Sequence, residues 1–206
     1  MSSATITTSA RLMNSTPQTE EQAMVRKVAV SSFLGNFIEW FDYASYSYFA
    51  TTIALVFFPT DNHTVAMLQT FGVFALSFIL RPIGALFWGS YGDKKGRKAA
   101  LAHSIMFMSG ASFLIGCLPS YSVIGVGAPI LLLLLRMVQG FSASGEYAGA
   151  ATFLGEYAPT SKRGIYCSLI PASTAIGLLA GSTLATLMPA NMNSSAMVGW
   201  GWRVPF

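Results

Sequence analysis

The sequence predicts an all-α membrane protein, and three observations carry this prediction. Of its 206 residues, 53% are hydrophobic and only 10% are Asp, Glu, Lys or Arg, whereas a soluble domain carries about 25% charged residues. The apolar residues gather in five runs, each as long as a membrane-spanning helix, which needs roughly 20 residues. Lys and Arg gather between these runs, on one side only. The composition excludes an ordinary soluble globule, a disordered chain and a disulfide scaffold.

The predicted elements follow in order from the N-terminus. Residues 1–24 form a polar tail rich in Ser and Thr, without the apolar core of a signal peptide. The transmembrane region is residues 25–206, with spans at about 28–58, 65–91, 99–118, 127–153 and 165–188 and the start of a sixth at 202. The first span exceeds the bilayer thickness and is expected to tilt or to carry an interfacial end. Trp200 and Trp202 fit the aromatic belt at which a sixth helix begins.

The basic residues predict the orientation of the chain, because cytoplasmic loops collect Lys and Arg. One side of the membrane holds nine of them, namely Arg11, Arg26, Lys27, Lys94, Lys95, Arg97, Lys98, Lys162 and Arg163. The other side holds none before Arg203. We therefore expect a multi-pass protein of the cell (inner) membrane with a cytoplasmic N-terminus. The net charge of +4 reflects this orientation, and no nucleic-acid partner is expected.

Five ionisable residues fall inside the predicted spans: Glu39, Asp42, Arg81, Arg136 and Glu146. Each would be costly if it faced lipid unpaired, so all are expected to face the protein interior or a water-filled cavity. At about 1.5 Å of rise per residue, Glu39, Arg81 and Glu146 lie roughly 15 Å from the cytoplasmic ends of their helices. The layer has one more carboxylate than it has guanidinium groups, and a surplus carboxylate is a candidate proton carrier. The alternative is a set of static ion pairs that hold the bundle together.

One face of the first span carries a polar and aromatic stripe. Its members recur at helical spacing and are Asn36, Glu39, Asp42 or Tyr43, and Tyr46. Such a stripe suits a polar substrate, and Trp40, Tyr43 and Tyr46 offer π faces to a cationic head group. The alternative for each ring is plain packing or a place near the interface.

Small residues and one amide mark the fourth and fifth spans. Gln139 and Glu146 are seven residues apart and share a helix face. The small residues around them, including Gly140, allow close helix contact, and Gly177 and Gly181 form another small-xxx-small pair. We expect this second pair to serve packing.

Enzymatic function is not expected. No phosphate-binding, dinucleotide-binding or hydrolase motif occurs, and His63 and His103 are isolated. Glu39 and Asp42 as an acid–base pair would be the enzymatic alternative, but they lie three residues apart on one helix, without a nucleophile or metal motif. No metal and no cofactor is expected.

Two stretches resemble a known transporter group. Gly89 to Lys98 is similar to the loop signature of the major facilitator superfamily, and Arg136 to Glu146 is similar to its fourth-helix motif as found in the metabolite:proton symporter family. Further family-like stretches are Gly35 to Asp42, Arg81 to Gly84, Glu156 to Pro159, Lys162 to Gly164 and Gly201 to Phe206. The resemblance covers about residues 26–206 and implies the N-terminal six-helix half of a twelve-helix fold, truncated at the start of helix six.

The resemblance also implies residue roles. The proton-coupling and substrate-cavity residues would be Glu39, Asp42, Arg81, Arg136, Gln139, Glu146, Asn36, Tyr43 and Tyr46. The cytoplasmic gate would comprise Gly89, Gly92, Asp93, Gly96, Arg97, Lys98, Glu156 and Arg163. The proton would be the coupling ion, and the lipid bilayer and a small solute would be the partners.

The implied function is proton-coupled symport of an osmolyte such as proline or glycine betaine. Dicarboxylate, citrate or shikimate symport is the alternative within the family, and an uncoupled facilitator is the nearest variant. The fifth span lacks the Gly-Pro signature of drug antiporters, because no Pro follows Ala180-Gly181-Ser182. Since the sequence ends at Phe206, we expect a half-carrier that needs a C-terminal half, or a fragment that does not transport alone.

Overall fold

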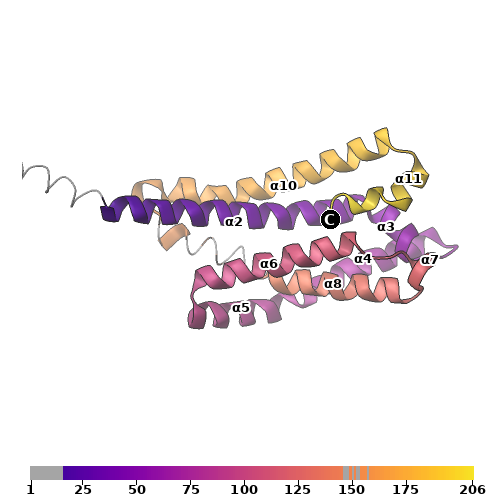
Figure 1. Cartoon of the computed structure of the whole chain (residues 1–206), viewed down its shortest axis with the longest axis horizontal. Helices are drawn as coiled ribbons and strands as arrows, with labels where there is room; N and C mark the ends of the chain where they lie inside the picture. The colour runs from indigo at the N-terminus through magenta and orange to yellow at the C-terminus, as the bar shows by residue number, and fades with distance from the viewer. Residues whose placement is uncertain (1–15, 146–148, 150, 152–153, 157) are drawn as a thin grey trace, which may run out of the picture.

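The computed structural model describes residues 16–145, 149, 151, 154–156 and 158–206, and these residues form a helical bundle (Figure 1). No strand occurs in this part of the chain. Glu146, which the sequence places in the charge layer, lies outside the described residues.

The first predicted span is formed by two helices that nearly join. Helix α2 covers Thr16–Tyr48 and α3 covers Ala50–Phe57. The backbone ladder continues through Phe49, whose N–H donates to the Ser45 carbonyl at 2.9 Å and whose carbonyl accepts from the Ile53 N–H at 2.9 Å. Helix α2 begins inside the predicted polar tail, where Glu, Gln, Ala and Met favour helix.

The second predicted span is also divided. Helix α4 covers His63–Ile79 and α5 covers Arg81–Lys95. The Asn62 side chain caps α4 by accepting from the N–H groups of Thr64 and Val65 at 3.0 and 3.3 Å. The break at Leu80 precedes Pro82, which lacks an N–H and cannot continue a regular helical ladder. This break places Arg81 at the first turn of α5.

The remaining helices run to the C-terminus. They are α6 (Arg97–Gly116), α7 (Tyr121–Ile124), α8 (Gly127–Ala143), η1 (Thr160–Lys162), α10 (Arg163–Asn191), α11 (Ser194–Gly199) and η2 (Gly201–Arg203). Gly96 joins α5 to α6 with φ of +92°, a conformation that residues with a Cβ rarely adopt.

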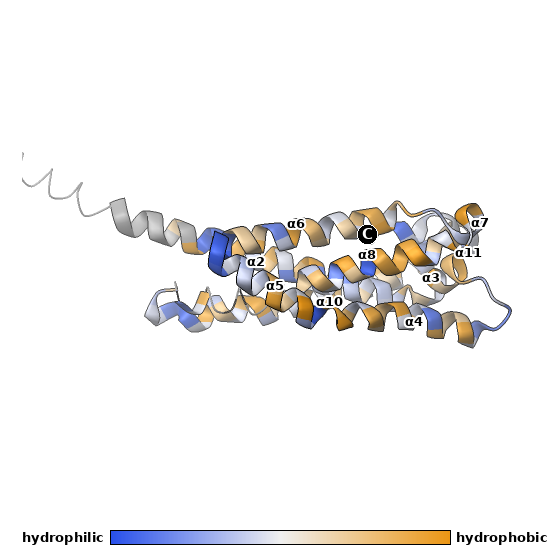
Figure 2. Ribbon diagram, turned by 90° about the horizontal axis from the view of Figure 1, so that it is seen from below, coloured by the Kyte–Doolittle hydropathy of each residue, from blue (hydrophilic) through white to orange (hydrophobic). Residues whose placement is uncertain are grey.

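Three helical segments among the described residues are long and apolar enough to cross a membrane: 63–95, 97–116 and 160–191. Helix α8 is apolar but has 17 residues, and in the predicted fourth span it is followed by a turn at 144–145, with residues 149 and 151 again helical. In Figure 2, orange predominates along the long helices and much of the blue lies toward the two ends of the bundle. Large apolar side chains such as Leu68, Leu86 and Phe113 are exposed on its outside, as expected of a surface that faces lipid.

Helices α2 and α10 lie side by side, and α2 also contacts α6 of the group formed by α4, α5, α6 and α8 (Figure 1). Gly177 and Gly181 permit this contact, because a Cβ at 177 would lie 2.8 Å from the Phe37 carbonyl oxygen and one at 181 would lie 2.6 Å from the Ala44 Cβ. The expectation that this glycine pair serves packing is confirmed.

Candidate functional site

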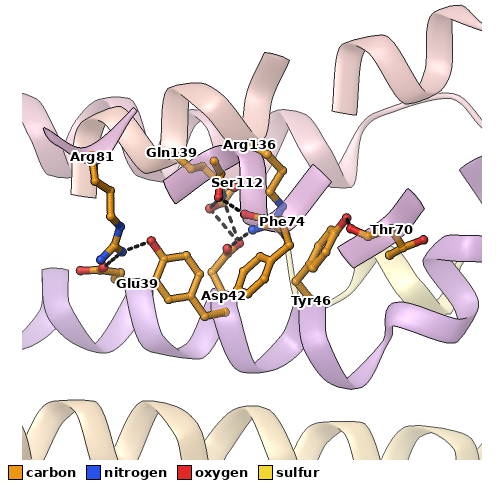
Figure 3. A network of polar contacts seen from close by, with 11 residues as sticks. Glu39, Asp42, Tyr46, Thr70, Phe74, Arg81, Ser112, Arg136 and Gln139 are labelled. Carbon is orange, nitrogen blue, oxygen red and sulfur yellow. Dashed lines mark hydrogen bonds and ion pairs between the residues drawn. The ribbon is translucent and has the colours of Figure 1, made fainter. Parts of the chain in front are cut away.

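Two carboxylates on α2 face the second group of helices and bind one arginine each (Figure 3). Glu39 forms an ion pair with Arg81, at the start of α5. Asp42, one turn further along, forms an ion pair with Arg136 in the middle of α8. The sequence predicts a charge layer across the first, second and fourth spans, and the structure pairs these four charges across three helices. Each pair joins one carboxylate to one guanidinium group, so the two pairs carry no net charge. The surplus carboxylate predicted from the sequence would be Glu146, which lies outside the described residues.

The Asp42–Arg136 pair is sealed inside the bundle. The exposed fractions of the two side chains are 4% and 1%. Asp42 Oδ1 also accepts hydrogen bonds from Gln139 Nε2 at 3.1 Å and from Ser112 Oγ at 3.2 Å, and Gln139 Nε2 lies 2.6 Å from Ser112 Oγ. This network joins α2, α6 and α8. Sequence reasoning missed Ser112, because a single Ser in an apolar span carries no signal that distinguishes it from a packing residue.

Tyr46 supports this network from the same helix. The Arg136 guanidinium carbon lies 3.9 Å from the centre of the Tyr46 ring, and the Tyr46 hydroxyl donates to the Thr70 carbonyl at 2.9 Å. Phe74 stacks on Tyr46, with 5.4 Å between the ring centres. The predicted π face of Tyr46 is thus occupied by a cation of the protein itself.

The Glu39–Arg81 pair is more open. The Arg81 side chain is 30% exposed, whereas the Glu39 side chain is 4% exposed. The Arg81 guanidinium also binds the Tyr43 hydroxyl, and its central carbon lies 5.1 Å from the Tyr43 ring and 4.7 Å from the Phe78 ring. The predicted cavity residue Tyr43 is therefore a ligand of Arg81.

Several polar atoms of these pairs are buried without a hydrogen-bond partner among the described residues. They are Glu39 Oε2, Arg81 Nε, Arg136 Nε and Nη2, and Gln139 Oε1. Since buried polar atoms are costly to leave unpaired, these atoms have capacity for a further hydrogen bond, to water or to a solute.

Asn36 belongs to the predicted polar stripe, but its side chain binds a different helix from those bound by Glu39 and Asp42. Its Nδ2 atom is within hydrogen-bond distance of the Ile170 carbonyl at 3.0 Å and of the Ser173 and Thr174 hydroxyls, both at 2.8 Å. It therefore joins α2 to α10, and among the described residues its hydrogen bonds go to α10 and not to the two ion pairs.

The predicted gate residues gather at the end of the bundle that carries the α5–α6 loop. Arg97 Nη1 lies 2.9 Å from Glu156 Oε2, and these side chains are 46% and 53% exposed. Arg163 Nε donates to the Ala158 carbonyl at 3.3 Å. A cavity of about 1220 Å³ opens here; the predicted residues in its lining are Gly89, Gly92, Asp93, Arg97 and Lys98. Asp93 forms no ion pair or hydrogen bond with the rest of the described chain.

Removing the Arg97–Glu156 pair should hardly change stability. We expect Arg97→Gln, Glu156→Gln and the double variant to change the free energy of unfolding by less than about 1 kcal/mol, because the pair is exposed and screened by solvent. Urea unfolding of the purified protein in detergent measures this. A loss above about 3 kcal/mol in either single variant would contradict a solvated pair.

No metal site is evident in the described residues, since none of their His, Cys, Asp and Glu side chains form a group of three or more suited to a metal ion. The chemistry available at the site is that of carboxylates, guanidinium groups and a phenol. Carboxylate and guanidinium groups can bind ionic solutes, and a carboxylate can also take up and release a proton.

The sequence is similar to those of known proteins. The family model described as "Sugar (and other) transporter" matches residues 27–206. The proline/betaine transporters of Salmonella typhimurium and Escherichia coli are each 41% identical over 186 residues, which is 90% of this chain and 37% of theirs. The alpha-ketoglutarate permease of Escherichia coli is 39% identical over 206 residues, which is 100% of this chain and 46% of the permease.

A solved structure has the same fold. It is a proton:xylose symporter of the major facilitator superfamily with bound 6-bromo-6-deoxy-D-glucose, and it matches with a TM-score of 0.73 at 17% identity over 90% of this chain and 42% of that chain. The present chain thus spans less than half the length of the relatives to which it is similar.

Proposed function

The chain belongs to the sugar (and other) transporter family of the major facilitator superfamily, and from this premise we propose that it forms the N-terminal half of a proton-coupled symporter for a small polar metabolite. The observation that carries the proposal is the pair of carboxylates on α2, each bound to an arginine of another helix. Charges within membrane spans mark solute and proton pathways.

The substrate proposed is a zwitterionic osmolyte such as proline or glycine betaine. Support comes from the names of the relatives at 41% identity and from the aromatic rings beside Arg81, which suit a solute with both a carboxylate and a cationic group. A dicarboxylate is the second candidate, because the alpha-ketoglutarate permease matches along the whole chain.

We further propose an inner-membrane location with a cytoplasmic N-terminus, since Lys and Arg gather beside the α5–α6 loop and η1. The loop residues and the Arg97–Glu156 pair would close the cytoplasmic side of the solute pathway. The C-terminal half would supply the opposite wall of the solute site, as in transporters built from two repeats. The role is transport without a cofactor and without an enzymatic step.

Uptake measurements test this proposal. The complete gene that contains this sequence is expressed in a bacterial strain that lacks its own proline and betaine uptake, and entry of labelled proline, glycine betaine and alpha-ketoglutarate is followed with and without a protonophore. We expect uptake of an osmolyte that the protonophore abolishes. Uptake of alpha-ketoglutarate without uptake of proline or glycine betaine would show that the substrate is a dicarboxylate and not an osmolyte. Uptake that the protonophore leaves unchanged would contradict proton coupling and favour a facilitator.

A further inference from the structure

The two arginines of these ion pairs differ in how far they are exposed. Arg136 is 1% exposed and is enclosed by Asp42, the Tyr46 ring and the Phe206 ring, with Gln139 and Ser112 completing the coordination of Asp42. Arg81 is 30% exposed and has one carboxylate and one phenol as partners. Only Arg81, of these two, presents a guanidinium that a solute can reach without dismantling a network.

The contact between Glu39 and Arg81 uses a single pair of atoms. Glu39 Oε1 accepts from Arg81 Nη2, which also binds the Tyr43 hydroxyl. Glu39 Oε2 and Arg81 Nε are buried and have no partner within the described part of the chain. A guanidinium prefers two parallel hydrogen bonds to a carboxylate. The single contact with Glu39 therefore leaves other N–H groups of Arg81 available to donate hydrogen bonds to a second carboxylate.

Aromatic rings surround the same guanidinium. Phe78 and Tyr43 lie against it, and Trp40 meets Tyr43 edge-on with 6.0 Å between ring centres. A carboxylate bound to Arg81 would place the rest of its molecule beside these rings. A quaternary or secondary ammonium group gains from such a ring face.

We propose that Arg81 is the residue that selects solutes bearing a carboxylate, by exchanging the Glu39 carboxylate for that of the solute. This inference rests on the proposed transport function. Glu39 leaves the guanidinium and accepts one proton from water on the side from which the solute enters, and the solute carboxylate takes its place. The proton neutralises Glu39 as the solute carboxylate replaces it on Arg81, so one proton, and with a zwitterionic solute one net positive charge, accompanies each solute. Asp42 and Arg136 remain paired and hold α2 against α8.

The charged and titratable groups around Glu39 fit this exchange. Asp42 and Tyr43 lie on its own helix, and Arg81 faces it from α5. On the opposite side of α2, α10 presents the hydroxyls of Ser173 and Thr174 to Asn36. Within the described residues, Arg81 is the cation paired with Glu39, and its occupation by a second anion releases Glu39 for protonation.

Competition binding tests the inference, because glycine betaine and choline share a quaternary ammonium group and differ in the carboxylate. Protein from the complete gene is purified into nanodiscs, and binding of labelled glycine betaine, proline, choline and alpha-ketoglutarate is measured. In Arg81→Gln we expect glycine betaine to bind roughly 10- to 100-fold more weakly, as for loss of a charged hydrogen bond, with choline unchanged. Arg81→Lys should bind glycine betaine more tightly than Arg81→Gln but more weakly than the wild type. Lysine keeps the positive charge but cannot form the two parallel hydrogen bonds of a guanidinium.

Three further variants complete the design. Glu39→Gln should bind glycine betaine at least as tightly as the wild type and lose its dependence on pH, because the competing carboxylate is gone. The double variant Glu39→Gln/Arg81→Gln leaves no buried unpaired charge and should bind as weakly as Arg81→Gln. Lys162→Gln removes an exposed cation of η1 and should bind like the wild type.

The outcomes separate the inference from the proposed function. Equal weakening of glycine betaine and choline in Arg81→Gln, or carboxylate binding unchanged in that variant, would overturn the selection by Arg81. If the wild type binds alpha-ketoglutarate but neither osmolyte, and Arg81→Gln abolishes that binding, the osmolyte proposal fails and the Arg81 inference stands. A wild type that binds none of these carboxylates would overturn both.

Discussion

Asp42→Asn should lower the free energy of unfolding by about 3–5 kcal/mol, which is the usual cost of leaving one buried charge without its partner. Arg136 would keep its charge at 1% exposure, and a carboxamide offers no negative charge to balance it. Ser112 and Gln139, which both bind Asp42 Oδ1, would also lose part of their alignment. Thermal or urea unfolding in detergent measures the loss.

The matched control removes both charges of that pair. Asp42→Asn/Arg136→Gln should recover much of the stability, because no unpaired charge remains in the bundle. If Asp42→Asn is as stable as the wild type, or if the double variant is the least stable of the three, the pair does not hold α2 against α8 as described here.

Gly140→Leu should prevent α4 and α8 from reaching their native distance, with a loss of about 3 kcal/mol or more in the free energy of unfolding. A Cβ at position 140 would overlap the Ser77 carbonyl oxygen and lie 2.8 Å from its carbonyl carbon. Both atoms belong to the backbone, so no side-chain movement relieves the clash. Helices in membranes pack closely where small residues allow it.

Gly110→Leu provides a comparison on α6, since a Cβ at 110 would meet no atom within 4 Å. We expect its free energy of unfolding to lie within about 1 kcal/mol of the wild-type value. Equal unfolding transitions for the variants at 140 and 110 would show that the α4–α8 contact does not depend on a bare backbone at Gly140.

Much of the fold and the chemistry of the site followed from the sequence. Apolar runs predicted the helices, and the Gly89–Lys98 and Arg136–Glu146 motifs predicted the superfamily, which the family match confirms. Because a charge is costly in lipid, Glu39, Asp42, Arg81 and Arg136 were expected to face the protein interior or a water-filled cavity. The structure pairs all four inside the bundle, which sequence reasoning had kept as the alternative.

The sequence could not predict which carboxylate pairs with which arginine. Residues 42 and 136 lie on different spans, and their contact depends on how each helix is rotated and where it is broken. The break at Leu80 turns Arg81 toward Glu39, and spacing alone did not predict it. Asn36 shares the spacing of the stripe but binds α10, because α2 is covered on two sides.

Under the proposed function, a proton moves inward with the solute through this charge layer. The direct measurement uses the complete protein in vesicles that enclose a pH-sensitive dye, with a membrane potential negative inside and no initial pH gradient. Adding glycine betaine or proline should acidify the lumen, and Glu39→Gln should abolish that acidification. Solute accumulation without any acidification in the wild type would contradict the account.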